Sequence, residues 1–283
     1  MPTHLPPWAP LAKPALTIAC FVVLWGVESI LPFFAEPRHR WRHAGRNLAI
    51  ALLNAAVLAF LFASLTVAVA DWSTSHQFGL LNQLHLPSPL HFIGAIVLLD
   101  LWLYVWHRLN HRVPFLWRFH RMHHSDHEMD VSTATRFHLG EHIGAATLRL
   151  GLIPVFGITA IEILIYETLV VAVTMFHHAN ISIGRFDRPL RWLTVTPFMH
   201  KVHHSRLRHE TDSNYSTLFS LWDRCFGSFR MRNDCRTLDL GLDGMDDDDR
   251  QTIRGMLLTP LRGPAPVSSQ RPSSDDTVDG MNT

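Results

Sequence analysis

Eight of the 20 histidines in this 283-residue sequence fall into three clusters with spacings that suit metal binding. The clusters read HRLNH, FHRMHH and FMHKVHH, and they contain His107 and His111; His120, His123 and His124; and His200, His203 and His204. On a helix, side chains at positions i and i+4 share one face with Cβ atoms about 5–6 Å apart, so two imidazoles can reach one ion. Because neutral imidazole binds iron, copper, nickel and zinc, the clusters indicate transition-metal chemistry.

The number of histidines indicates two ions rather than one. Two ions with about four imidazoles each would use all eight residues and keep positions for water or oxygen. Adjacent histidines such as His123 and His124 point about 100° apart on a helix, so we expect them to serve different ions. A histidine-rich surface without metal is the alternative for any single residue, but three repeats of a chelating spacing favour a site.

Long apolar segments precede the clusters. The chain is 47% apolar and only 17% charged, which is typical of a membrane protein. About 20 mainly apolar residues cross a hydrocarbon core of roughly 30 Å. Three segments have this length, namely 14–34, 47–70 and 89–108.

A fourth apolar segment, 143–176, is interrupted by Pro154 and Gly157. A single crossing here would place the third cluster on the opposite side of the membrane from the first two, so we expect a re-entrant or full helical hairpin that turns near these residues. The predicted fold class is therefore all-α. It is an integral membrane helical bundle of three spans plus the hairpin, with a cytosolic histidine-rich helical cap that holds the metal site.

Arginine placement predicts the orientation. The first connection, 36–46, contains four arginines, whereas the second, 71–89, contains neither lysine nor arginine. The positive-inside rule places the first connection, and with it the histidine clusters, on the cytoplasmic face. Ala-, Leu- and Arg-rich spans favour a bacterial inner membrane, with a eukaryotic reticulum membrane as the second choice. The first apolar run is long enough to be a retained anchor rather than a cleaved signal.

Composition divides the chain into three regions. We expect an N-terminal membrane hairpin region at 1–88, a catalytic domain with the histidine clusters at 89–237, and a disordered polar tail at 238–283, where acidic residues, proline and serine accumulate. Three cysteines without CxxC spacing predict neither a disulfide framework nor a thiolate zinc site.

Longer motifs around the clusters resemble a known family. DLWLYVWHRLNH, FHHAN at 176–180 and NYSTLFSLWDRCFGS at 214–228 are similar to motifs of the membrane-bound fatty acid hydroxylase/sterol desaturase superfamily, whose three histidine boxes match the clusters. The resemblance extends from about Asp100 to Ser228, and the motifs follow one another in the same order as in the family. Two positions differ from the family pattern. Leu139 stands where relatives often have proline, and Ser216 stands where they have glycine.

The resemblance implies a centre of two iron ions that uses O₂ to hydroxylate or desaturate an unactivated C–H bond of a lipid, with zinc able to replace iron on purification. It implies the eight cluster histidines as ligands, with His178 and His138 as further candidates. Metal-bound histidines usually donate their second ring N–H to an acceptor. The candidate acceptors are Asp100, Glu141, Asn180, Asp212 and Asp223. We assign no catalytic residue beyond the metal centre, and we assign neither His43 nor His177 to the site.

The expected partners are a lipid substrate from the bilayer, O₂ and a separate electron donor. The sequence has no cytochrome b5-like, flavin-binding or ferredoxin-type motif, so a ferredoxin- or cytochrome b5-like protein with its reductase would supply electrons. Arginines beside the clusters could dock an acidic partner or bind anionic head groups. They are Arg112, Arg118, Arg121, Arg206 and Arg208. We expect no nucleic-acid partner.

The alternative function is a metal-ion transporter or a metal-binding membrane protein. Transporters place their ligands near the middle of the membrane, whereas these clusters follow the ends of the apolar segments beside arginines that would repel cations. An intramembrane zinc protease would need an HExxH motif, which the sequence does not complete.

Overall fold

The computed structural model describes residues 9–35 and 39–263, with side chains from residue 11 onward. These residues form helices and loops, with two isolated β-bridges and no strand, which confirms the all-α class. The long helices are α1 (Ala9–Ile30), α2 (Arg40–Leu58), α3 (Ser64–Ser75), α5 (Ser88–Arg112), α7 (Leu139–Phe156) and α8 (Ala160–His178). A π-helical turn, η1 (Ala59–Ala63), joins α2 and α3 into one continuous rod.

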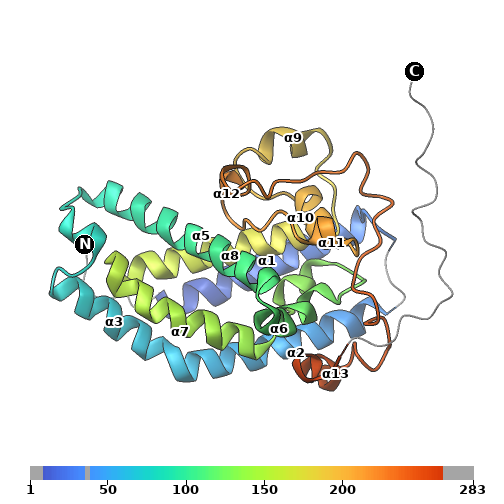
Figure 1. Cartoon of the computed structure of the whole chain (residues 1–283), viewed down its shortest axis with the longest axis horizontal. Coiled ribbons are helices and arrows are strands. Elements are labelled where there is room, and N and C mark those ends of the chain that lie inside the picture. Colours follow the sequence, from blue (N-terminus) through green and yellow to red (C-terminus); the bar gives the residue numbers. More distant parts are fainter. Residues whose placement is uncertain (1–8, 36–38, 264–283) are drawn as a thin grey trace.

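The shorter helices lie mainly at one end of this bundle and form a cap (Figure 1). They are α4 (Leu80–Gln83), α6 (Pro114–His124), α9 (Asp187–Leu190), α10 (Pro197–His203), α11 (Arg208–Thr211), α12 (Leu221–Cys225) and α13 (Ile253–Leu257), with the 3₁₀ turns η2 (Val131–Thr135), η3 (Gly184–Phe186) and η4 (Thr259–Leu261). The helix α4 is the exception, since it lies at the opposite end, between α3 and α5.

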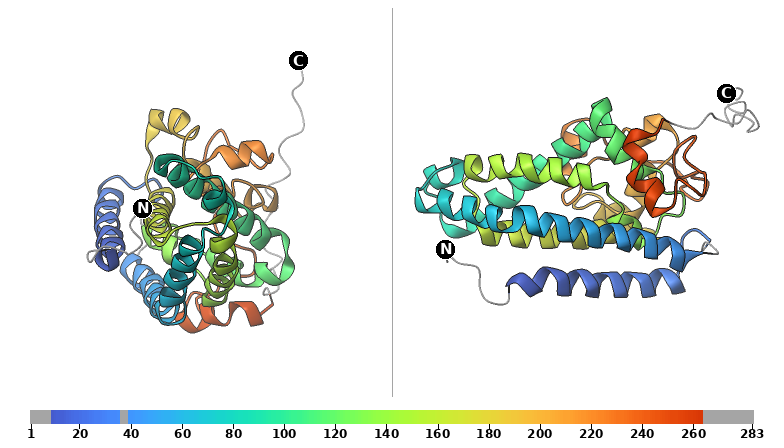
Figure 2. Two further views of the ribbon diagram at one scale, coloured as in Figure 1. Left: turned by 90° about the vertical axis from the view of Figure 1, so that its left-hand side faces the viewer. Right: turned by 90° about the horizontal axis from the view of Figure 1, so that it is seen from below.

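The long helices alternate in direction. The helices α1, α5 and α8 run toward the cap, whereas α2–α3 and α7 run away from it, so each histidine-bearing segment reaches the same end of the bundle (Figure 1). The first helix, α1, lies at the edge of the bundle and packs mainly against α8 (Figure 2).

Four helical segments are long and apolar enough to cross a membrane, which indicates an integral membrane protein. They are Leu11–Ile30, Arg40–Gln83, Ser88–Arg112 and Ala160–His178. The three uninterrupted apolar segments of the sequence each correspond to one of them, although the first helix ends at Ile30, four residues before the expected end at 34. The second segment is longer than expected because α2 already begins at Arg40, inside the arginine-rich stretch that the sequence placed in a connection.

The predicted hairpin is present as α7 and α8. It turns at Gly157, whose φ of 78° is left-handed, and Pro154 lies in the last turn of α7. Gly79, at the end of the α3–α4 connection, approaches this turn so closely that a Cβ atom would lie 2.3 Å from the Pro154 carbonyl oxygen. The number of membrane crossings that α7 and α8 make stays a prediction.

Buried polar contacts join the helices at the cap end. The carboxylate of Glu28 in α1 accepts hydrogen bonds from Arg40 Nη2 at 2.7 Å, from the Val131 amide at 3.1 Å and from the Asn180 amide at 2.9 Å. The Asn180 side chain pairs with the backbone of Phe34 at 2.8 and 3.0 Å. In a lipid environment such hydrogen bonds and close packing, rather than the hydrophobic effect, hold helices together.

Asp100 joins the cap to the middle of α5. Its carboxylate is fully buried and accepts hydrogen bonds from the amides of Leu218 and Phe219 at 3.2 and 3.0 Å and from Trp222 Nε1 at 2.8 Å. The Tyr166 hydroxyl of α8 donates to the same carboxylate at 3.2 Å. Asp100 therefore fixes the segment before α12 against two spanning helices.

The tail prediction is wrong for residues 238–263, which are folded. Leu238, Leu240 and Met256 are buried against the cap. Gln251 accepts a hydrogen bond from the buried Arg136 at 2.6 Å. A few apolar residues between acidic ones are enough to anchor this segment because the cap offers them a preformed surface. The remainder of the expected tail, 264–283, lies outside the described residues.

We predict that Asp100→Ala lowers the free energy of unfolding by about 2–4 kcal/mol, because it leaves buried donors of Leu218, Phe219 and Trp222 without their acceptor. Thermal unfolding of the purified protein in detergent measures the change. Asp248→Ala, at an exposed carboxylate of the cap, is the control and should unfold like the parent. Equal unfolding temperatures for Asp100→Ala and the parent would contradict the structural role of Asp100.

Candidate metal centre

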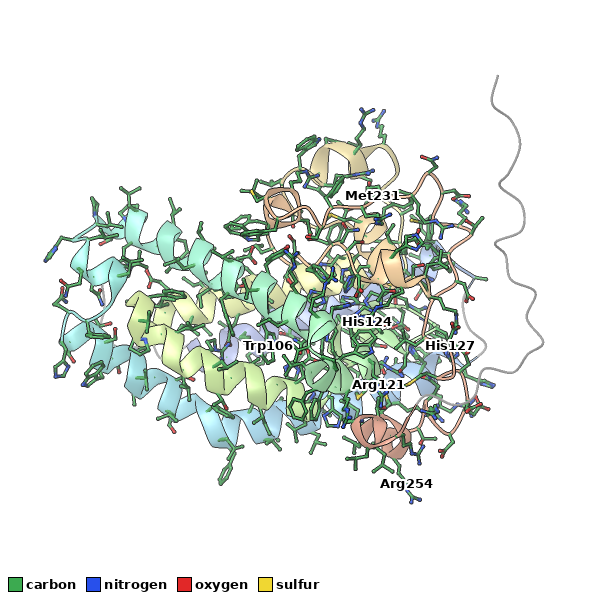
Figure 3. All side chains as sticks on the ribbon, in the orientation of Figure 1. Trp106, Arg121, His124, His127, Met231 and Arg254 are labelled. Carbon is green, nitrogen blue, oxygen red and sulfur yellow. The ribbon has the colours of Figure 1, made fainter. Side chains whose placement is uncertain are left out.

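Nine histidines meet at the cap end of the bundle in two adjacent groups. Within each group, one ligand atom per residue lies within 4.8 Å of every other. The larger group is His107, His111, His120, His124 and His203, and the smaller group is His123, His178, His200 and His204. Figure 3 shows His124 where the long helices meet the cap. All but His107 are buried.

Four helices deliver these side chains. The end of α5 supplies His107 and His111, α6 supplies His120, His123 and His124, the last residue of α8 is His178, and α10 supplies His200 and His203 and ends before His204. The short helices α6 and α10 both begin with proline, which fixes the backbone angle at their first turn.

Adjacent histidines separate as helix geometry requires. His123 belongs to the smaller group and His124 to the larger, and the pair His203 and His204 divides between the groups in the same way. The two groups nevertheless touch, because the rings of His124 and His204 stack with centroids 4.5 Å apart.

Backbone carbonyls orient three of the rings. His107 Nδ1 donates to the Tyr215 carbonyl at 2.8 Å, His203 Nδ1 to the Ser213 carbonyl at 2.6 Å, and His178 Nδ1 to the Thr174 carbonyl at 2.7 Å. A neutral imidazole has one ring proton, so a proton on Nδ1 leaves Nε2 as a lone pair. Each of these three rings therefore presents an unprotonated Nε2 to the centre.

The facing lone pairs require a cation. His107 Nε2 and His203 Nε2 lie 3.1 Å apart, and neither has a proton to donate to the other. Two nitrogens bound to one ion at about 2.1 Å and at right angles to each other are separated by about 3 Å. The geometry of this donor set thus fits a bound transition metal.

Burial keeps five of the cluster histidines neutral. Loss of solvation, followed by the neighbouring histidines, lowers the pKa of His123, His124, His200 and His204 well below the usual value. Burial likewise lowers the pKa of His203 to about 3. Neutral rings are the form that binds metal, so no proton has to leave before an ion enters.

Two of the five predicted acceptors contact a histidine. Glu141 Oε1, in the first turn of α7, accepts from His120 Nδ1 at 2.9 Å. Asp212 Oδ1 lies 3.4 Å from His111 Nδ1, while its other oxygen accepts from Arg208 Nε at 2.8 Å.

The other three predicted acceptors act elsewhere. Asp223 accepts from the amides of Tyr215 and Ser216 at 2.7 and 3.0 Å, so it holds the loop whose carbonyl orients His107. Asp100 bonds the α12 segment, and Asn180 bonds the α1–α2 connection, as described above. Among the described contacts, neither side chain bonds a histidine ring.

His138 lies outside both groups. Its Nδ1 accepts from the Gly140 amide at 3.0 Å, which caps the start of α7, and its Nε2 donates to the Leu257 carbonyl at 3.1 Å. Both ring nitrogens are therefore engaged away from the candidate centre.

Comparison with known proteins relates this arrangement to a family. Residues 92–228, which hold all nine grouped histidines, match the fatty acid hydroxylase family. This match and the relatives below support the resemblance to the membrane fatty acid hydroxylase/sterol desaturase superfamily.

Three relatives illustrate the extent of the match. An ornithine lipid hydroxylase of Rhizobium tropici is 29% identical over 56% of this chain and 47% of its own length. Human alkylglycerol monooxygenase is 30% identical over 52% of this chain and 32% of its own length. A cholesterol 25-hydroxylase-like protein of Danio rerio is 31% identical over 48% of this chain and 53% of its own length. The chain thus spans about half or less of the relatives it matches, and no solved structure matches it.

The structure also shows polar residues near the site that the sequence did not reveal. His43 of α2 bridges two buried carboxylates, with Nε2 at 2.9 Å from Asp126 and Nδ1 at 3.1 Å from Asp130. The i, i+4 spacing of His43 and Asn47 on a buried face is a signal that could have found it. His177 packs its ring 4.0 Å from that of His200 but belongs to neither group.

We predict that Glu141→Ala weakens metal binding to the larger group about 10–100-fold, because His120 loses the acceptor that orients it. Competition with a chromophoric chelator measures the affinity. His138→Ala at the same end of α7 is the matched control and should retain parental affinity. The reverse order, with the larger loss in His138→Ala, would contradict the geometry.

We also predict that the metal-free protein loses stability in acid. The pKa values of five cluster histidines are lowered in the folded chain, so below pH 6.5 the unfolded chain binds protons that the folded chain does not. The free energy of unfolding should therefore fall between pH 6.5 and 5, by up to about 2 kcal/mol for each such histidine.

Unfolding temperatures of the metal-stripped protein at pH 7.5 and 5.0 measure this effect. His76→Ala, at an exposed histidine far from the cap, serves as the control and should keep the parental pH dependence. A stability that stays constant between the two pH values would show that the cluster histidines are not buried in neutral form.

Proposed function

We propose that this protein is a membrane-bound di-iron oxygenase that hydroxylates or desaturates a lipid, using O₂ and electrons from a separate donor. One observation carries the proposal, namely the convergence of nine imidazoles, eight of them buried, in two touching groups. Five and four nitrogen donors are enough for two ions with open positions, and they are too many for one.

The relatives support a lipid as the substrate class. Their names specify an ornithine lipid, an alkylglycerol and cholesterol, which differ in shape but are all membrane lipids. Each name also denotes the introduction of oxygen. The region that matches the fatty acid hydroxylase family contains both histidine groups.

The protein's own residues would bind, orient and enclose the metals. The grouped histidines would hold two iron ions, with zinc as a substitute on purification. When bound, iron supplies the activation of O₂ that C–H oxidation needs. Glu141 and the carbonyls of Ser213 and Tyr215 keep the Nε2 lone pairs directed inward. Burial excludes water from the donors, while the position at the end of the spanning helices lets a lipid arrive laterally from the bilayer.

The electron donor would approach the cap, which we place on the cytoplasmic side of a bacterial inner membrane. A ferredoxin- or cytochrome b5-like protein fits this role. Three of the five arginines suggested for docking are engaged within the cap, and one of them, Arg208, pairs with Asp212. Arg206 pairs with Asp239, Asp243 and Asp246, and Arg121 donates to the Thr259 carbonyl. Arg112 and Arg118 are left as the better candidates.

Metal analysis of single histidine variants tests the proposal. After expression with added iron, the parent should contain about two metal ions per chain. His123→Ala and His203→Ala each remove a donor from a different group, so each should lose mainly one ion, and the double variant should lose both. His209→Ala, at an exposed histidine next to the third cluster, is the matched control.

Lipid analysis of cells with the parent or the double variant tests the reaction. The parent should produce lipids that have gained one oxygen or lost two hydrogens, and the double variant should not. Unchanged metal content in the double variant, or metal-dependent ion flux through liposomes without lipid oxidation, would overturn the oxygenase assignment.

A further inference from the structure

A cavity of about 150 Å³ lies behind the smaller histidine group. Its walls come from the segment after α8, from η3 and α9, and from α10. The lining residues are Phe33, Ile181, Ser182, Ile183, Gly184, Asp187, Arg191, Phe198 and Lys201. Because Ser182 and Gly184 are exposed, the cavity reaches the surface of the protein.

The cavity contains a buried cation. Lys201 is only 1% exposed, and Nζ donates to the carbonyls of Ala179 and Ile181 at 2.9 and 3.3 Å. A lysine ammonium has three donors, so the described contacts leave one for a ligand. Among the described residues, its charge is balanced by neutral carbonyls and by the faces of Phe33 and Phe34, at 5.3 and 6.0 Å, rather than by a carboxylate within ion-pair distance.

The other charged groups of the cavity leave it positive. Asp187 forms an ion pair with Arg191, four residues further along the chain. Lys201 is then the excess charge among the lining residues, so the cavity is suited to a small anionic group.

The surface beside the cavity is apolar. Phe186, Trp192 and Leu193 are 60%, 69% and 65% exposed, and they flank the cavity-lining residues Asp187 and Arg191 in the chain. Leu221 of α12 is 51% exposed. Tryptophan and arginine together are characteristic of the interface between lipid head groups and hydrocarbon.

The contacts of Asp100 indicate how deep this apolar surface lies in the membrane. That residue lies at the middle of α5 and bonds Leu218, Phe219 and Trp222, so α12 packs beside the membrane-spanning part of α5. Figure 1 shows α9 and α12 on the same side of the bundle as α5. The exposed apolar residues are thus continuous with the lipid-facing surface of the spans.

We propose that the cavity binds the anionic head group of a membrane lipid, with Lys201 and Arg191 contacting the head group and Phe186, Trp192 and Leu193 immersed in the bilayer. We take the lipid with this head group to be the substrate, and that assignment rests on the proposed function. Lys201 directly follows His200, and its acceptors Ala179 and Ile181 follow His178. The same two chain segments therefore line the head-group cavity and carry His178 and His200 of the smaller histidine group.

Binding of short-chain lipids to the metal-loaded protein in detergent tests the inference. The probes are dioctanoyl phosphatidic acid, the neutral dioctanoylglycerol and inorganic phosphate. We expect phosphatidic acid to bind more tightly than the other two. Lys201→Met should weaken its binding about tenfold or more, since a charge-assisted hydrogen bond is lost. Arg188→Gln, at an exposed arginine of α9 that does not line the cavity, is the matched control and should bind like the parent.

A second variant covers the case in which Lys201→Met does not fold. Ile183→Trp fills the cavity while both cations remain, and it should also weaken phosphatidic acid binding. Parental affinity in Ile183→Trp or in a folded Lys201→Met would overturn the site. Equal affinity for inorganic phosphate and phosphatidic acid would overturn the lipid assignment.

The metal content of each variant separates this inference from the proposed function. Lys201→Met and Ile183→Trp should retain about two metal ions, since neither residue belongs to a histidine group. Selective phosphatidic acid binding by a protein that oxidises no lipid would leave the head-group site intact and refute the oxygenase.

Discussion

This fold depends on the close approach of unprotonated imidazole nitrogens from distant parts of the chain. His107 and His203 come from helices almost a hundred positions apart, yet their Nε2 atoms face each other at 3.1 Å with no proton between them. Burial disfavours the extra proton that would relieve the repulsion. A shared metal cation would relieve this repulsion, and the cap holds the rings in the orientation that such a cation needs. Hydrogen bonds from Nδ1 to backbone carbonyls fix the rings, and Asp223 in turn fixes the loop that provides one of those carbonyls.

A consequence of this construction is that much of the structure serves orientation rather than hydrophobic burial. The spanning helices are apolar on surfaces that lipid would cover, so lipid contact gives them little reason to prefer one arrangement. Glu28, Asp100 and Asn180 supply that preference through buried hydrogen bonds between helices and loops. They hold α1, α5 and α8 in the relative positions that bring the histidine-bearing ends together.

The sequence predicted well which histidines lie close together, because their spacing determines it. Chelating intervals, the proline and glycine between α7 and α8, and the division of His123 from His124 all follow from helix geometry and can be read without coordinates. The ring acceptors were harder to predict. Ser213 and Tyr215 act through backbone carbonyls, which any residue type could supply, so their identity carries no signal. His138 illustrates the reverse problem, because a histidine in a family motif can also be a helix cap. The folded segment 238–263 escaped prediction because its few apolar residues have no helical or strand period.

That folded segment has a consequence for the order of assembly. Gln251 binds Arg136 and the Ser125 carbonyl, and Thr259 accepts from Arg121, so the segment closes over the helix that carries the middle histidine cluster. The ribosome synthesises it more than a hundred residues after α6. During translation the imidazoles of α6 are therefore in an incomplete shell that is open to the surrounding solution. Enclosure of the candidate metal centre is then a late event in biogenesis, so a metal ion can enter before the shell closes.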